Sequence, residues 1–182
     1  HVGDFFLGYS HMLSDRVARV LPHWNRNVPG YGFIEGMYAF GLEEAGNYEQ
    51  AETRGRDAVA LNEQDGWAVH AVTHVMEMQG RAAEGADFLA AGADGWAPNS
   101  MFAYHLWLHK ALFHLDANDA AAALNLFDEK MSAGGFGQAL ELVDGSALLW
   151  RLWLLGHDVG DRWNDLAKKW ETRVDDAYYA FN

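Results

Sequence analysis

The sequence contains no cysteine and only three prolines. Without cysteine, the chain offers no disulfide framework and no thiolate for a metal or redox centre. Pro22, Pro29 and Pro98 all fall between helix-like segments, where a proline interrupts no helix. Alternating β-branched runs bounded by turns are absent as well, so the pattern indicates an all-α protein.

Long apolar runs are also missing. The longest, residues 147–155, is interrupted by Arg151 and is far shorter than the roughly 18 residues needed to span a bilayer. We therefore expect no membrane segment. The chain begins with His1 and shows no signal peptide, so we expect either a processed chain or a piece of a longer protein.

Basic residues are few. The 13 lysines and arginines stand against 26 acidic residues, which gives a formal net charge of −13. An acidic surface repels phosphate, so we expect no nucleic-acid partner. The glycine-rich segment 134–137 lacks the preceding strand and the lysine of a phosphate-binding loop, and no serine nucleophile elbow occurs. Half of the residues are hydrophobic, which is ample for a folded core.

What the sequence does contain is an internal repeat. Gly46, Tyr48 and Ala51 match the pattern at the turn of a tetratricopeptide repeat. That pattern is a glycine, an aromatic residue two positions later and a small residue three positions after that. Gly80 begins a second turn 34 residues after Gly46, with Ala82 in place of the aromatic residue and Gly85 as the small residue, and 34 residues is the length of that repeat. Asn118, which also tolerates a left-handed backbone, takes the place of glycine in a third turn.

The repeat phase predicts a tetratricopeptide-like α-α superhelix, a solenoid of about four to five helical hairpins. We expect one domain over residues 1–182, with a longer connector over 131–145; an ordinary helical bundle is the alternative. The expected repeat units are 1–22, 32–63, 66–95, 104–131 and 146–173.

The first helix of each repeat is expected to line the concave side of such a superhelix, and helical periodicity selects its inward positions. These positions are Phe33, Gly36, Met37, Phe40 and Glu43 in one repeat, Trp67, His70, Ala71, His74 and Glu77 in the next, and His105, Leu108, His109, Leu112 and Leu115 in the third.

Four of these inward residues are histidines in two i, i+4 pairs, which we expect on neighbouring faces. One such pair can bind a metal ion through two imidazoles, and two pairs on adjacent helices can complete a site. The candidate metal ligands are thus His70, His74, His105 and His109, for a divalent transition metal. The same cluster suits proton transfer, because imidazole titrates near neutral pH.

A structural role for the histidines stays open, in which they bond to one another and to nearby backbone. His70 to His74 lacks the glutamate that follows the first histidine of a zincin motif. The order from His74 to Glu77 is the reverse of the Glu-x-x-His order of di-iron bundles. We expect His114 to be a core histidine and Glu43, Glu44, Glu49 and Glu52 to form a solvated helix face. Packing between helices is the expected role of Trp107, Trp150, Trp153, Trp163 and Trp170.

Several longer strings resemble the tetratricopeptide repeat protein 38 family. They are the segments 29–32, 36–44, 65–81, 104–115 and 140–152, and the resemblance covers essentially the whole chain. It implies a soluble helical-repeat protein with no established activity, which we expect in the cytoplasm. It also implies that this chain is a central fragment, with 180–182 opening a further helix.

Three functions follow as hypotheses. The leading one is a scaffold whose concave groove binds a peptide, a protein or a small ligand through Phe40, His70, His74, Glu77, His105 and His109. The alternative is a metal-dependent or histidine-assisted enzyme that uses the same histidines, with Glu77 as a ligand or orienting group. The third is the purely structural role.

Overall fold

The computed structural model describes residues 2–98 and 100–175, and every regular element within these ranges is a helix. The all-α prediction is therefore confirmed. The chain divides into two compact units, residues 1–100 and 101–182. The predicted further helix at 180–182 lies outside the described residues.

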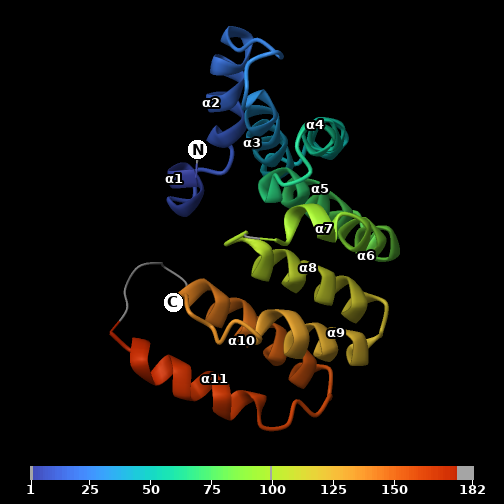
Figure 1. Ribbon diagram of the computed structural model, residues 1–182, viewed down its shortest axis with the longest axis vertical. Coiled ribbons are helices and arrows are strands. Elements are labelled where there is room, and N and C mark those ends of the chain that lie inside the picture. Colours follow the sequence, from blue (N-terminus) through green and yellow to red (C-terminus); the bar gives the residue numbers. More distant parts are fainter. Residues whose placement is uncertain (1, 99, 176–182) are drawn as a thin grey trace. The chain divides into compact units, whose positions relative to one another are not determined.

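The first unit holds seven α-helices and one short 3-10 helix among its described residues (Figure 1). They are α1 (Val2–Phe6), α2 (Met12–Val20), η1 (Leu21–His23), α3 (Tyr31–Glu44), α4 (Tyr48–Leu61), α5 (Gly66–Met78), α6 (Ala82–Ala91) and α7 (Ala93–Trp96). Helix α3 packs against α2, α4 and α5, and α4 also packs against α5. Each hairpin thus contacts the next, as expected of stacked helical pairs.

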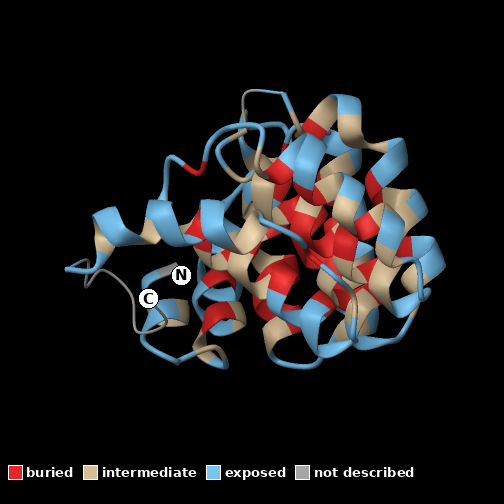
Figure 2. Cartoon of the chain, turned by 90° about the horizontal axis from the view of Figure 1, so that it is seen from below, coloured by how far each residue is buried: buried red, intermediate tan, exposed pale blue. Residues whose placement is uncertain are grey.

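The second unit holds α8 (Ala103–Asp116), α9 (Ala120–Leu126), the π-helical turn η2 (Phe127–Met131), α10 (Ala139–Leu154), α11 (Arg162–Trp170) and η3 (Glu171–Arg173). Helix α8 packs against α9, η2 and α10, and α10 packs against α11. In both units, most helices carry buried residues along one side and exposed residues along the other (Figure 2), whereas most residues of α5 are buried. The one-sided arrangement is the pattern of amphipathic helices around a core.

The predicted turns are confirmed in detail. Gly46 and Gly80 have φ angles of 78° and 68°, and Asn118 has the same left-handed conformation with φ 60°. Each of these residues ends the first helix of a hairpin, where a left-handed residue lets the chain reverse. Ala51 and Ala58, the predicted small positions of α4, are fully buried at 0% exposure.

The prediction of a connector over 131–145 is wrong in its second half, because α10 already begins at Ala139. A capping box starts this helix: the Gln138 side chain bonds to the backbone of Glu141, and the Glu141 carboxylate accepts the Gln138 N–H at 3.1 Å. The last repeat therefore starts earlier than residue 146. Gly145 lies inside α10, where a Cβ would stand 2.8 Å from the Phe136 ring, so the missing side chain makes room for Phe136.

None of the helices in the described ranges combines the length and the apolar character that crossing a bilayer requires.

Candidate functional site

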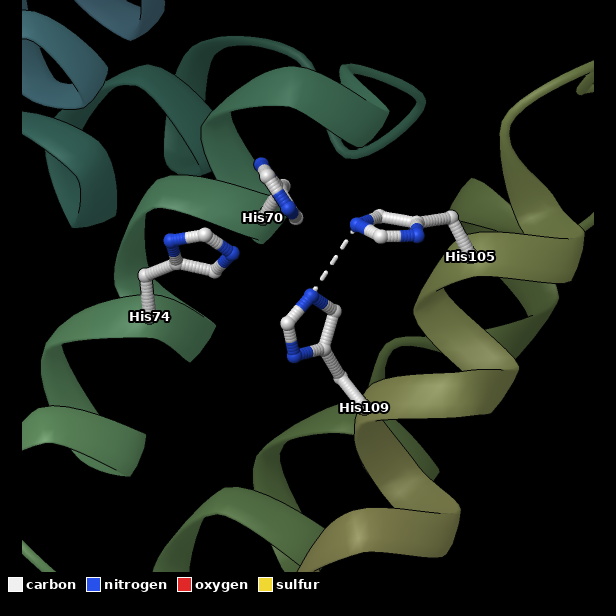
Figure 3. Close-up of side chains that lie close together, drawn as sticks. All are labelled: His70, His74, His105 and His109. Carbon is white, nitrogen blue, oxygen red and sulfur yellow. Dashed lines mark hydrogen bonds between the residues drawn. The ribbon is translucent and has the colours of Figure 1, made fainter. Parts of the chain in front are cut away.

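The two histidine pairs lie on the helices that the sequence predicts for them. His70 and His74 are one turn apart on α5, and His105 and His109 are one turn apart on α8 (Figure 3). The first pair belongs to the first unit and the second pair to the second unit. The common surface for all four stays a prediction from the sequence, and the geometry of each pair stands by itself.

The α8 pair has closely placed ring nitrogens. Nε2 of His109 lies 3.2 Å from Nε2 of His105, the contact drawn as a dashed line in Figure 3. The ring centroids are 4.7 Å apart and the ring planes are almost perpendicular, at 89°. His109 is only 6% exposed. Two nitrogens at this spacing either share a proton or hold one cation between them.

A carboxylate from another helix fixes the α8 pair. Nδ1 of His105 lies 2.6 Å from Oδ2 of Asp144 on α10, and Asp144 is 7% exposed. An ionised carboxylate only accepts hydrogen bonds, so it places the proton of the His105 ring on Nδ1. The lone pair is then on Nε2, which is the atom that faces His109.

Asp144 is the functional residue that sequence reasoning missed. The one signal in the sequence is its position, since it is the only acid between Leu142 and Leu152, a mainly apolar stretch whose other polar residues are Ser146 and Arg151. A carboxylate that is buried on such a helix needs a partner, because an unpaired buried charge is costly. Its partner lies 39 positions earlier in the chain, which helical periodicity alone does not reveal.

The α5 pair packs among aromatic rings. The His70 and His74 rings have centroids 4.0 Å apart, and His70 is 4% exposed. The Phe40 ring on α3 lies 5.4 Å from His70 and the Trp67 ring lies 5.7 Å from it. Phe40 is itself buried at 1% exposure. Glu77, one turn beyond His74 on α5, is partly buried.

A carboxylate also contacts the α5 pair. Oε2 of Glu43, near the end of α3, lies 3.3 Å from Nδ1 of His74. Glu43 is 6% exposed, so the prediction of a solvated face is wrong for this residue. It is wrong for Glu44 too, since that carboxyl is partly buried, and burial raises its pKa. Only Glu49 is fully solvated as predicted, and Glu52 forms ion pairs with Arg56 and Arg81.

The predictions for the five tryptophans and for His114 have different outcomes. Trp107, Trp163 and Trp170 pack against the core of the second unit, as predicted. Trp150 is 52% exposed, but its ring meets the Trp163 ring of α11 edge-on at a centroid distance of 6.5 Å, so it contacts a neighbouring helix as predicted. The prediction is wrong for Trp153, which is 54% exposed and whose ring contacts Trp150 of its own helix. His114 is partly buried, and its Nδ1 lies 3.9 Å from Oδ2 of Asp119, which is a longer contact than a hydrogen bond.

No family model matches this chain, and no solved structure matches it. In chemical terms, a carboxylate–imidazole–imidazole chain such as that of Asp144, His105 and His109 can hold a metal ion or move a proton.

Proposed function

We propose that this chain is a tetratricopeptide-like helical-repeat protein whose α8 histidines, His105 and His109, bind a divalent transition-metal ion. The observation that carries the proposal is the distance of 3.2 Å between their Nε2 atoms. In a tetrahedral site with metal–nitrogen bonds of 2.0–2.1 Å, two ligand nitrogens stand about 3.3 Å apart. The observed spacing of the two nitrogens therefore suits two ligands of one ion.

Asp144 supports the proposal from outside the ligand set. Histidines that bind a metal usually donate their other ring N–H to a carboxylate, which fixes the tautomer and makes the ligand nitrogen more basic. The contact of 2.6 Å between Asp144 and Nδ1 of His105 is this arrangement. Two imidazole ligands favour zinc, copper, nickel or cobalt over magnesium or calcium.

Metal titration tests this proposal. Protein purified without a histidine tag is titrated with Zn²⁺ by calorimetry and with Co²⁺ by its visible absorption, which reports tetrahedral coordination. The wild-type chain should bind Zn²⁺ with a defined stoichiometry, and His105→Ala and His109→Ala should each weaken that binding severely. His114→Ala is the matched control, because it removes a third imidazole from the same helix. Equal zinc binding by wild type and His109→Ala would overturn the proposal.

The variant His70→Ala/His74→Ala belongs to the same series. The sequence predicts that all four imidazoles serve one ion, and a loss of zinc binding in this variant supports that prediction. Unchanged zinc binding assigns the ion to the α8 pair and rejects the four-histidine prediction.

Ligand binding on the inner helices is the second candidate, and the exposure of two aromatic residues favours it. Phe33 on α3 and Trp67 on α5 occupy predicted inward positions and are 51% and 36% exposed. Aromatic side chains open to solvent on successive first helices suit a peptide that lies across them.

Peptides selected from a displayed random library test this candidate. Binding should weaken in Phe33→Ser and persist in Trp153→Ser, which removes an equally exposed aromatic residue from α10. A library that yields no binder, or binders that are insensitive to Phe33→Ser, rejects it.

The strings that resemble the tetratricopeptide repeat protein 38 family support placing the chain in that family and in the cytoplasm, also as a proposal.

A further inference from the structure

A second group of metal-ligating side chains lies within the first unit, apart from the α8 pair. It consists of Glu43 and Glu44 at the end of α3 and His74 on α5. One ligand atom from each of the three lies within 4.8 Å of the other two. The packing of α3 against α5 brings them together, although 30 positions separate Glu44 from His74 in the sequence.

From this geometry we infer a second metal site, in which Glu43, Glu44 and His74 bind a divalent cation that accepts oxygen ligands, such as Mn²⁺. The site contains two carboxylates and one imidazole. Oxygen-rich sites of this kind suit manganese and iron(II), whereas the two-imidazole pair on α8 suits zinc or copper. The inference shares with the function proposed above the idea that the chain binds metal ions, but it concerns a different site with different ligands.

Charge balance favours a cation at this place. Glu43 and Glu44 are adjacent carboxylates, and among the described residues neither forms an ion pair with a lysine or an arginine. Glu43 is 6% exposed, and its one ion-pair partner there is His74. When the imidazole is neutral, two adjacent carboxylates remain, of which Glu43 is buried and Glu44 partly buried, and a divalent ion would compensate both charges.

The surroundings hold the three side chains in place. Ser10 donates a hydrogen bond to the Glu44 carboxylate. The Phe40 ring meets the His74 ring edge-on at a centroid distance of 6.1 Å. The His74 side chain is 23% exposed, which leaves a path for an ion from solvent. Hydrogen-bonded ligands next to an apolar wall are typical of metal sites.

The alternative is a plain ion pair between Glu43 and protonated His74, with Glu44 as a bystander. The two models differ in the role of Glu44. If Glu44 is a ligand, its carboxylate is required for cation binding, whereas in the ion-pair model its loss changes only the overall charge.

Manganese titration in the His105→Ala/His109→Ala background separates this site from the α8 site. Free Mn²⁺ is followed by electron paramagnetic resonance, and the background variant should bind one Mn²⁺ per chain. Adding Glu44→Gln should weaken Mn²⁺ binding by about tenfold or more. Glu49→Gln removes the same charge from an exposed position on α4 and should leave Mn²⁺ binding unchanged.

The fold is checked by circular dichroism in each variant, since Glu44→Gln retains an acceptor for Ser10. Absence of Mn²⁺ binding in the background variant overturns the inference, and so does an equal effect of Glu44→Gln and Glu49→Gln. A wild-type chain that binds manganese but no zinc would reject the α8 proposal alone. A wild-type chain that binds zinc but no manganese would reject the site of Glu43, Glu44 and His74 alone.

Discussion

Asp144 on α10 accepts a hydrogen bond from Nδ1 of His105 on α8 at 2.6 Å. This contact joins the first helices of two successive hairpins and leaves the lone pair of His105 on Nε2. The lone pair then points toward His109. The Asp144 carboxylate therefore determines that Nε2, and not Nδ1, is the nitrogen of His105 that can bind a metal.

The first prediction concerns this contact. Asp144→Asn should weaken Zn²⁺ binding by about 10- to 100-fold. An amide oxygen accepts a weaker hydrogen bond from Nδ1–H of His105 than a carboxylate does, so Nε2 becomes less basic and a poorer ligand. Calorimetric titration measures the change. Asp116→Asn, an exposed acid at the end of α8, is the control and should bind zinc like the wild type. Equal zinc affinity in all three proteins would mean that Asp144 has only a structural role.

The second prediction concerns the close approach of α2 to α3 at Gly41. A Cβ at this position would lie 2.5 Å from the backbone nitrogen of Ser14, and backbone cannot move aside as a flexible side chain does. Gly41→Ala should lower the free energy of unfolding by about 1–3 kcal/mol, as overpacking does. Urea unfolding followed by circular dichroism measures the change.

Gly3→Ala is the control for that experiment, since a Cβ on Gly3 meets nothing within 4 Å and α1 is helical there. It should leave stability unchanged or raise it slightly, because alanine favours a helix more than glycine does. A Gly41→Ala protein as stable as the wild type would show that α2 shifts freely on α3.

The third prediction concerns the ion pair between Glu52 on α4 and Arg81, which precedes α6. Hydrogen bonds from Arg81 lower the pKa of Glu52 to about 2 from its usual 4.5. The depressed value means that the pair stabilises the fold above pH 4.5, and that this contribution disappears as the pH falls from 4.5 to about 2. Since the pair is partly exposed, it contributes about 1 kcal/mol.

Urea unfolding at a series of pH values between 6 and 3 tests this. Arg81→Met should be less stable at pH 6 and should lose less stability on acidification than the wild type. Arg19→Met removes an exposed arginine from α2 and should keep the wild-type pH dependence. Parallel curves for wild type and Arg81→Met would contradict the assignment.

The fourth prediction concerns Asp65, the N-cap of α5. Its Oδ1 accepts hydrogen bonds from Trp67 N–H at 3.1 Å and Ala68 N–H at 3.2 Å. Burial raises the pKa of this carboxyl above 3.8, so its ionisation costs stability as the pH rises through the folded-state value. Asp65→Asn should remove that part of the pH dependence while it keeps the cap.

Asp65→Ala serves as the comparison, because it removes the cap as well and should lower stability by about 1 kcal/mol. Thermal melts of the three proteins at pH 4 and pH 7 distinguish the two effects. If Asp65→Asn and Asp65→Ala lose the same stability at pH 7, the carboxylate charge itself stabilises the helix start, and the prediction is wrong.

The local features of the fold could be predicted from the sequence. Left-handed turns at Gly46, Gly80 and Asn118 follow from residue type, because glycine and asparagine tolerate positive φ angles. The start of α10 was missed, since a capping box that begins with Gln138 has no serine or threonine to mark it. The prediction is wrong for Trp153, because hydrophobic character alone does not tell which face of a helix meets another helix.

The sequence by itself determined that the chain is helical, where its hairpins turn, and that His70 and His74, like His105 and His109, share one face of a helix. These are effects within one helix, which repeat every 3.6 residues and need no partner. Only the tertiary structure decided that Asp144 reaches His105 and that Glu43 reaches His74. Such contacts depend on how two helices pack, so the bond of Asp144 to His105 is a property of the folded core rather than of either helix alone.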